Sequence, residues 1–160
     1  MDDRLGLATD QGIPWKIPAD VEHFRSVTVG VDVLMGFATY VEFAAPMPGR
    51  TNFVATARGQ DLREGFVPVK EVDAFLSGGH PGDIWIIGGA MLFALTLGMV
   101  QELFLTRVQG DFHCTKFFPA FEDTFRLAES TTPPRTEGTP AIVFQTWIRD
   151  ADGALPSPPG

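Results

Sequence analysis

The chain has 160 residues, and its hydrophobic fraction of 44% and charged fraction of 20% are typical of a globular protein. This length suits one domain, and no apolar run approaches the roughly 20 residues that a membrane-spanning helix needs. The net charge of −8 excludes a general nucleic-acid binder, because such proteins present basic faces to phosphates. The start, MDDRLG, lacks the basic and apolar regions of a signal peptide, so we expect a cytoplasmic protein.

Few side chains suit metal or thiol chemistry. Cys114 is the only cysteine, which excludes a disulfide within the chain and is typical of a reducing compartment. It is a reactive thiol or, as we expect, a small buried side chain. The three histidines are scattered, so we expect no metal site. A small anionic ligand remains possible, and the candidate cations for it are Arg25, Arg50, Arg58 and Lys70.

The first half of the chain alternates helical and strand patterns. Pro18 suits a first helical position and predicts a helix through Val27. The apolar, β-branched run VDVLM ends at Gly36 and predicts a buried strand over 31–35. The patterns that follow predict a helix over 37–43, a turn over 45–50, a strand over 51–56, a polar loop over 57–65, a strand over 67–69, a helix over 71–76 and a loop over 78–83.

The second half opens on the sharpest signature, IWIIGGAMLFALTL over 84–97, which predicts a strand, a turn and a helix. The later patterns predict a strand over 102–108, an aromatic loop over 112–121, a C-terminal antiparallel hairpin from 124–130 and 141–148, and a disordered tail over 150–160. Strands that alternate with short helices predict an α/β fold with a mostly parallel central sheet and flanking helices. Ligands of such folds bind at the carboxyl ends of the strands.

Asp20 stands out because it shares a helical face with two apolar residues. Residues four and seven apart stack on one face, so Asp20 lies in line with Phe24 and Val27. An acid in a first turn is also favoured by the helix dipole and by capping, which leaves a purely structural interpretation open. A carboxylate on an apolar stripe needs a fixed donor, and a heterocycle with two adjacent N–H groups would satisfy it bidentately.

Two strand-to-helix turns suggest a nucleotide site. Gly88–Gly89 follows the strand IWII, and MGFAT over 35–39 repeats the arrangement at a second strand end. Backbone N–H groups at such turns attract phosphate, although close packing of a strand against a helix explains the glycines equally well. Two turns of this kind could hold the two ends of a dinucleotide.

Together, these blocks resemble the dihydrofolate reductase family. The resemblance covers about Leu5 to Arg149 and rests on GIPWKIPADVEHF, VLMGFATY, MPGRTNFVAT, IWIIGGAMLF, LFLTRV, TKFFPAF and FQTWI, in the family's order. It implies a single dihydrofolate reductase-like domain over 1–149 that transfers a hydride from NADPH to dihydrofolate. The product, tetrahydrofolate, serves one-carbon metabolism. It also implies dihydrofolate and antifolate inhibitors as ligands, with no nucleic-acid or membrane partner, and a monomer.

The resemblance also implies roles for individual residues. Asp20 would be the carboxylate that binds the pterin ring, with Trp15 anchoring an ordered water beside it and Thr106 supporting it. The other substrate-binding residues would be Val21, Phe24, Arg25, Arg50, Ile87 and Phe93, with Arg50 pairing with the glutamate tail. The cofactor-binding residues would be Gly6, Ile13, Gly36, Phe37, Ala38, Thr39, Thr56, Arg58, Lys70, Ile87, Gly88, Gly89, Ala90, Met91 and Leu92, with Arg58 meeting the 2′-phosphate. Residues 7–15 would form a loop that closes over the nicotinamide, with Ile13 near its ring.

The start of the chain departs from the family, whose members open with an apolar strand before this loop. Only MDDR precedes Leu5 here, and three explanations compete: a misassigned start, a truncation, or another segment or partner that fills the gap. We favour the first and expect the chain as written to fold poorly and to catalyse little, because unpaired interior strands leave buried backbone groups unsatisfied. Phe37 also replaces a frequent basic residue, which weakens the expected preference for NADPH over NADH.

Two other functions share part of this pattern. A related pyrimidine reductase of riboflavin biosynthesis has the same sheet and the IGG block but does not need the PWxxPxD block found here over 14–20. A truncated, non-catalytic relative would bind pterin or nucleotide tightly without hydride transfer. An assay of NADPH consumption with dihydrofolate separates these alternatives.

Overall fold

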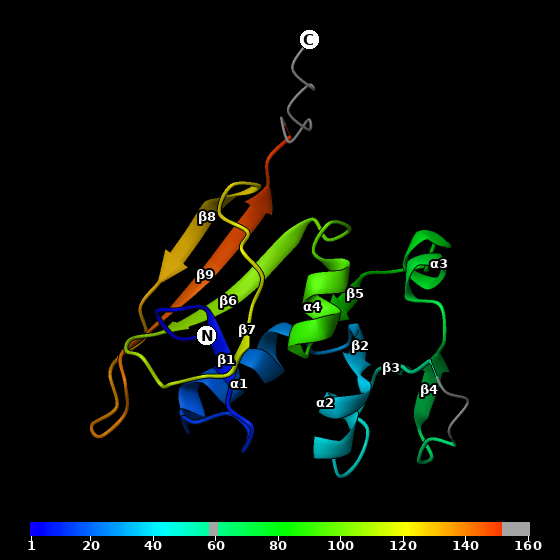
Figure 1. Ribbon diagram of the computed structural model, residues 1–160, viewed down its shortest axis with the longest axis horizontal. Helices are drawn as coiled ribbons and strands as arrows, with labels where there is room; N and C mark the ends of the chain where they lie inside the picture. Colours follow the sequence, from blue (N-terminus) through cyan, green and yellow to red (C-terminus); the bar gives the residue numbers. More distant parts are fainter. Residues whose placement is uncertain (58–60, 152–160) are drawn as a thin grey trace. The chain divides into compact units, whose positions relative to one another are not determined.

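The computed structural model describes residues 1–57 and 61–151 of the chain (Figure 1). It divides into two compact units: unit 1 is Met1–Ile17 together with the chain from Val100 onward, and unit 2 is Pro18–Met99. The predicted α/β class is confirmed, because unit 2 alternates helices with strands of a parallel sheet. The single domain over 1–149 stays a prediction, and most of the predicted disordered tail lies outside the described residues.

Unit 2 contains four helices and four strands among its described residues. The helices are α1 (Pro18–Val27), α2 (Phe37–Glu42), α3 (Val72–Ser77) and α4 (Ala90–Thr96), and the strands are β2 (Asp32–Gly36), β3 (Asn52–Ala55), β4 (Phe66–Val69) and β5 (Ile84–Ile86). The sheet order is β4-β3-β2-β5 and every neighbouring pair is parallel. Each element lies within about two residues of its predicted range, so the sequence interpretation of this unit is confirmed.

The core of unit 2 explains why its strands have continuous apolar runs. The three central residues of β2 are completely buried, and they point alternately to the two faces of the sheet. Val33 and Met35 pack with Val54, Phe66 and Tyr40. Leu34 packs on the other face with Val69 and Leu92. A strand that is covered on both faces needs apolar residues at every position, not only at alternate ones.

The parallel register brings all four strand ends to the same edge of the sheet. Gly36 pairs with Ala55, and Ala55 pairs with Val69 on the next strand. On the other side, Leu34 of β2 pairs with Ile86 of β5. The turns that follow these strands therefore start along one edge, where a parallel sheet binds its ligands.

Unit 1 consists of a short antiparallel pair and a larger antiparallel sheet. Its strands are β1 (Gly6–Ala8), β6 (Glu102–Val108), β7 (Lys116–Phe117), β8 (Phe125–Thr131) and β9 (Ile142–Arg149). The larger sheet has the order β6-β9-β8, and its antiparallel β8 and β9 confirm the predicted C-terminal hairpin. Met1 lies beside β6, where its amine donates to Thr106 O at 2.7 Å and its carbonyl accepts from Val108 N at 2.8 Å.

Two predictions for unit 1 were wrong. The predicted loop over 7–15 begins later, because Leu7 and Ala8 belong to β1. Residues 112–121 were predicted to be a loop throughout, but Lys116–Phe117 form β7, which pairs with β1. The pairing joins segments that are about 110 residues apart in sequence, with Gly6 opposite Phe117 and Ala8 opposite Lys116. A two-residue strand has no detectable period of its own, so only its partner reveals it.

Two further observations concern the chain as far as it is described. Cys114 is a free, buried cysteine, as expected. Within residues 1–57 and 61–151, no helix is both long and apolar enough to cross a membrane.

The buried side chain of Asn52 provides hydrogen bonds inside unit 2 whose contribution to stability can be measured. Its buried side chain accepts from Met47 N at 2.9 Å and donates to Met47 O and Arg50 O at 2.9 and 3.2 Å. We expect Asn52→Ala to lower the free energy of unfolding by about 2–4 kcal/mol, because it leaves these backbone groups unsatisfied. Urea denaturation measures this loss. Gln109→Ala, at an exposed position, should change it by less than about 0.5 kcal/mol, and an equal effect of both variants would contradict the assignment.

Candidate functional site

The α1 helix presents Asp20 as predicted. Asp20, Phe24 and Val27 are all partly buried, whereas Val21 and Arg25 on the same helix are exposed. The carboxylate of Asp20 has no hydrogen-bond or ion-pair partner within residues 1–57 and 61–151. A half-buried carboxylate on an apolar stripe that has no donor of its own is suited to bind a ligand that brings donors.

Arg50 is held against the end of this helix. Its guanidinium donates to Thr28 O and, through Nε, to Pro48 O at 3.0 Å. Thr28 directly follows α1, and its hydroxyl donates to Phe24 O at 2.8 Å. A cation at a helix C-terminus is favoured by the exposed carbonyl groups there. The predicted role of Arg50 toward an anionic ligand is untested, and these bonds add a structural role that the sequence did not indicate.

The two glycine turns of unit 2 are in direct backbone contact. Gly36 N donates to Gly88 O at 2.7 Å, and a Cβ on Gly36 would lie 3.5 Å from both Gly88 O and Gly89 N. The peptide bond between Gly88 and Gly89 is cis, and Gly88 has a φ of +125°. The hydroxyl of Thr39 lies 3.4 and 3.6 Å from where the Cβ atoms of Gly88 and Gly89 would be. We call this contact the glycine seam; it consists of Gly36, Gly88 and Gly89.

The two helices that begin at the seam have no side-chain caps. Gly36 and Gly89 are the N-caps of α2 and α4, and neither helix has a side-chain capping hydrogen bond. Backbone can approach a ligand closely where Cβ atoms are absent, and uncapped N–H groups suit a diphosphate. The residues present therefore fit the backbone part of a dinucleotide site.

The other predicted cofactor residues of unit 2 differ in environment. Phe37 and Ala38 are exposed at the start of α2, and Met91 is 89% exposed on α4. Leu92 has its side chain in the core against Leu34 and Val69, so only its backbone faces a ligand site. The remaining residues are the partly buried Thr39, Ile87 and Ala90, the buried Thr56 and the exposed Lys70. Arg58 lies outside the described residues.

Two predicted substrate residues of unit 2 pack beside the strands and the seam. Ile87 donates its backbone N–H to Leu34 O at 3.0 Å and packs against the core cluster that includes Val33. The ring of Phe93 lies 3.8 Å from the position of a Cβ on Gly88. Both side chains are partly buried, so each retains some surface for a ligand.

The predicted residues of unit 1 lie on β1, on β6 and on the loop after β1. Ile13 is 61% exposed on that loop, and Trp15 packs its ring edge-on against Phe112, with centroids 5.2 Å apart. Gly6 is buried, and a Cβ there would lie 2.5 Å from Cys114 Cβ. Close packing against Cys114 therefore also explains a glycine at position 6, in addition to its predicted cofactor role. Thr106 lies on β6 and accepts the Met1 amine through its carbonyl.

Sequence reasoning missed several polar contacts that join distant residues. His80 Nε2 lies 3.1 Å from Asp32 Oδ2, and Asp32 Oδ1 accepts from Thr51 N at 2.7 Å. The backbone N–H and guanidinium of Arg63 donate to the Tyr40 hydroxyl and lower the pKa of that phenol. In unit 1, the buried carboxylate of Asp2 accepts hydrogen bonds from three backbone N–H groups. These pairs are separated by many residues and follow no period, so no local pattern could indicate them. The described part of the chain contains no group of three or more metal-ligating side chains.

Comparisons with known proteins agree with this arrangement. A family model described as dihydrofolate reductase matches residues 1–149. The dihydrofolate reductase type 3 of Salmonella typhimurium is 33% identical over 146 residues, which cover 89% of this chain and 90% of that protein. The dihydrofolate reductase of Bacillus subtilis is 28% identical over 144 residues, with coverages of 88% and 84%. The solved structure of dihydrofolate reductase from Enterococcus faecalis, complexed with NADP(H) and RAB-propyl, has a TM-score of 0.85 at 22% identity and covers 94% of this chain and 92% of that chain.

The glycine seam gives a direct prediction. Gly88→Ala should lower the free energy of unfolding by about 1–3 kcal/mol, because a φ of +125° is unfavourable for a residue with a Cβ. Thermal or urea denaturation measures the change. Gly98→Ala is the matched control, since its Cβ would meet nothing within 4 Å, and it should shift stability by less than about 1 kcal/mol. A Gly88→Ala protein as stable as the Gly98→Ala protein would rule out this constraint.

Proposed function

We infer the activity of this chain from its family, because the family model over residues 1–149 and the 33% identical Salmonella relative show that it belongs to the dihydrofolate reductase family. The chain is an oxidoreductase that transfers a hydride from NADPH to 7,8-dihydrofolate and produces 5,6,7,8-tetrahydrofolate. Its substrate and its inhibitors are small molecules. The observation in the structure that supports this function best is the half-buried carboxylate of Asp20, which has no partner among the described residues.

Asp20 is the residue that we propose to bind the pterin ring. A carboxylate has two oxygens, and it accepts two N–H groups from one planar heterocycle in a bidentate arrangement. The 2-amino group and the neighbouring ring nitrogen of a pterin offer such a pair. Accepting these two hydrogen bonds stabilises positive charge on the ring and therefore favours the protonated ring, which accepts a hydride more readily.

The other predicted substrate residues are proposed for the rest of the contacts. Phe24 lies one helical turn after Asp20 on the same half-buried face, and the exposed Val21 adjoins it. We propose that these two side chains, with Ile87 and Phe93, contact the rings of the substrate. Arg25 and Arg50 are proposed for the glutamate tail, where a planar guanidinium matches a carboxylate. Trp15 and Thr106, in unit 1, keep their predicted roles toward the substrate as part of this proposal.

The glycine seam is the proposed site of the cofactor diphosphate. NADPH supplies the hydride when it is bound, and the residues of the chain hold and orient it. Gly36 and Gly89 are the N-caps of two helices that have no side-chain cap, and the glycines place no Cβ atoms beside these helix starts, which supports this placement. Six other predicted cofactor residues, from Phe37 to Thr39 and from Ala90 to Leu92, form the first turns of the two helices that begin at the seam.

We also propose that the protein works as a cytoplasmic monomer without nucleic-acid or membrane partners. The net charge of −8 supports the lack of a nucleic-acid partner. The lone, buried cysteine supports a reducing compartment, since it leaves no pair to oxidise within the chain.

The proposed role of Asp20 is tested by an isosteric substitution. Asp20→Asn replaces one acceptor oxygen with a donor, so it loses one of the two proposed hydrogen bonds and the negative charge. We expect kcat/KM for dihydrofolate to fall by about 10²-fold or more, measured as NADPH consumption at 340 nm.

Glu22→Gln is the matched control for that experiment. It makes the same change of charge on the same helix, at an exposed position, and should leave kcat/KM within about twofold of the unsubstituted protein. Equal turnover by the Asp20→Asn and unsubstituted proteins would refute the proposed role. Tight binding of dihydrofolate or NADPH without hydride transfer by the unsubstituted chain would identify a non-catalytic relative instead.

A further inference from the structure

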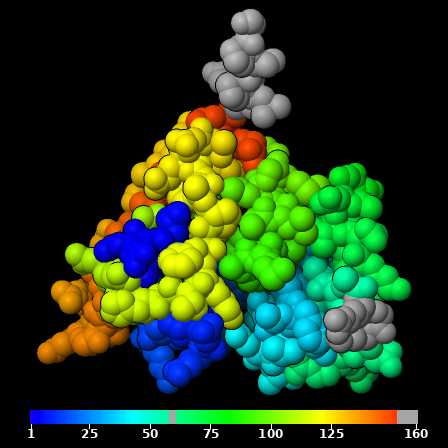
Figure 2. All heavy atoms as spheres, in the orientation of Figure 1, coloured from blue at the N-terminus to red at the C-terminus, as the bar shows by residue number. Residues whose placement is uncertain are grey.

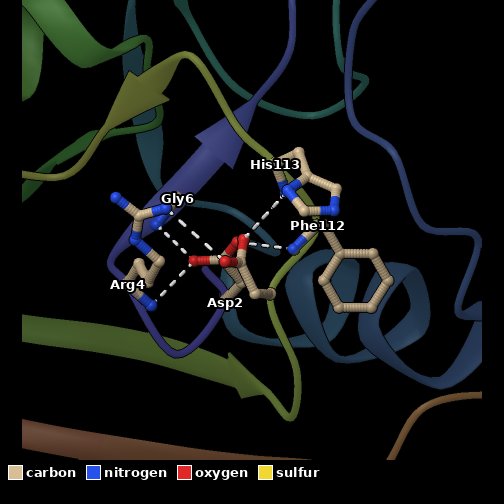
Figure 3. A network of polar contacts seen from close by, with 6 residues as sticks. Asp2, Arg4, Gly6, Phe112 and His113 are labelled. Carbon is tan, nitrogen blue, oxygen red and sulfur yellow. Dashed lines mark hydrogen bonds and ion pairs between the residues drawn. The ribbon is translucent and has the colours of Figure 1, made fainter.

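Among the residues that the structure describes, Asp2 is the most buried acidic side chain that the proposed reaction does not use. It is 1% exposed, and its carboxylate accepts backbone hydrogen bonds on both oxygens (Figure 3). Oδ1 accepts from Gly6 N at 2.7 Å and from Arg4 N at 2.9 Å, and Oδ2 accepts from Phe112 N at 3.1 Å. One side chain therefore ties the start of β1 to the segment that follows β6.

Electrostatics keep this carboxylate ionised. Burial acts to raise the pKa of Asp2, but the N–H groups of Phe112, Gly6 and Arg4, together with the Cys114 thiol, hold it below its usual value. Burial raises the pKa of the Cys114 thiol, and the charge of Asp2 adds to this effect, so Cys114 remains a donor. A carboxylate that accepts several N–H groups is stable in its charged form even without water.

The two segments joined by Asp2 fit each other closely. Asp3 N donates to Gly110 O at 3.0 Å, and Gly110 N donates to Asp3 Oδ2 at 2.9 Å. At Gly6, any Cβ would lie 2.5 Å from Cys114 Cβ and 2.7 Å from the Asp2 oxygens, so the contact requires glycine. Figure 2 shows the N-terminal residues, in blue, flanked by the yellow-green surface of the chain around residues 110–120. The position of residues 110–115 is thereby fixed relative to the N-terminus.

The same segment contacts the end of β1 at one point and the loop that carries Trp15 at two points. The ring of Phe112 packs edge-on against Trp15, at 5.2 Å between centroids and 71° between planes. Thr115 N donates to Ala8 O at 2.9 Å, and Thr115 Oγ1 donates to Asp10 Oδ1 at 3.2 Å. Asp2 holds the backbone of Phe112, and Phe112 holds the ring of Trp15.

We propose that Asp2 is a positioning residue, which fixes the loop over residues 9–15 through the contact between Phe112 and Trp15. Asp2 does not touch the substrate; it determines where the Phe112 ring stands, and that ring supports Trp15 from the side. The link to turnover rests on the proposed function of Trp15, whereas the structural coupling stands on the contacts alone.

The test compares Asp2→Asn with a matched control. The Asn side chain has one acceptor oxygen and one NH₂ group, which is a donor. At least one of the three backbone N–H groups that bond to Asp2 therefore faces a donor and loses its hydrogen bond. Asp123→Asn makes the same change of charge at an exposed position of unit 1. Hydrogen exchange followed by mass spectrometry, on peptides that cover residues 109–116 and 8–17, reports the two segments separately.

We expect Asp2→Asn to accelerate exchange at least tenfold in both segments, with far-UV circular dichroism unchanged, and Asp123→Asn to accelerate neither. In turnover we expect kcat to fall about 3- to 10-fold, while KM for NADPH changes less than twofold. Faster exchange in residues 109–116 with an unchanged loop over 8–17 would overturn the proposal, because Asp2 would then be merely structural. The hydrogen-exchange measurements do not depend on enzyme activity. A chain that transferred no hydride would refute the proposed function, but exchange would still test the coupling between Asp2 and the loop.

A second variant keeps the proposal testable if Asp2→Asn fails to fold. Phe112→Leu retains Asp2 and an apolar side chain but removes the ring contact with Trp15. It should accelerate exchange in residues 8–17 and leave the N–H of Phe112 protected. If both variants fold, the two substitutions can be combined in one protein. Because both act on the contact between Phe112 and Trp15, hydrogen exchange in residues 8–17 of that double variant should be at most about twofold faster than in the faster-exchanging single variant. Independent, multiplicative effects, or a loop unaffected by Phe112→Leu, would overturn the proposal.

The low pKa of Asp2 adds a second readout. The other titratable or charged groups of the N-terminal segment over 1–17 and of residues 109–116 are the Met1 amine, Asp3, Arg4, Asp10, Lys16, Asp111, His113, Cys114 and Lys116. Because the pKa of Asp2 is lower in the folded state, its contribution is complete above the ordinary value of about 4 and is lost as pH falls through the folded value. The urea midpoints of the unsubstituted and Asp2→Asn proteins should therefore differ at pH 7, and the difference should shrink as pH falls below the ordinary value of about 4. A difference that stays constant with pH would contradict an ionised Asp2 in this role.

Discussion

The arrangement of unit 2 depends on one hydrogen bond between backbones, from Gly36 N to Gly88 O. The bond joins the ends of two parallel strands at the points where α2 and α4 begin. A Cβ on Gly36 would lie at ordinary contact distance, 3.5 Å, from Gly88 O and Gly89 N, whereas the φ of +125° at Gly88 is unfavourable for any residue with a Cβ. Neither α2 nor α4 has a side-chain cap, so the two helix starts that this bond joins leave their first N–H groups to a ligand.

Local signals predicted nearly all of unit 2. Pro18 marks the first residue of α1, and Gly36 and the Gly88–Gly89 pair mark the points where strands give way to helices. These residues act through their own backbone geometry, which a sequence displays directly. The strand β7 could not be predicted in this way, because Lys116–Phe117 are extended only through their pairing with Gly6–Ala8. Non-local hydrogen bonds leave no period in either segment.

In the candidate site, too, features set by local sequence could be predicted, and features set by tertiary packing could not. The face of α1 that carries Asp20 follows from the helical period, and the structure confirms that Asp20, Phe24 and Val27 are all half-buried. The contacts of Arg50 with the end of α1 and the core position of Leu92 depend on tertiary packing, so the residue types alone indicated only a cation and an apolar side chain. The sequence therefore indicated the chemical character of these side chains, but only the structure shows which way they point and what they contact.

Asp2 and Asp20 show how the surroundings of a carboxylate separate structure from function. Both lie among apolar residues, where an ionised oxygen without donors is costly. Asp2 is almost fully buried and receives three backbone N–H groups from its own chain, so its needs are met and it fixes the backbone around it. Asp20 is only half-buried and receives none from the described residues. Water can serve Asp20 until a ligand with matching donors displaces it, and a ligand gains binding energy there because the protein does not compete for the same oxygens. An acid that the described residues leave unsatisfied on an apolar helix face is therefore a better guide to the substrate site than an acid with both oxygens paired.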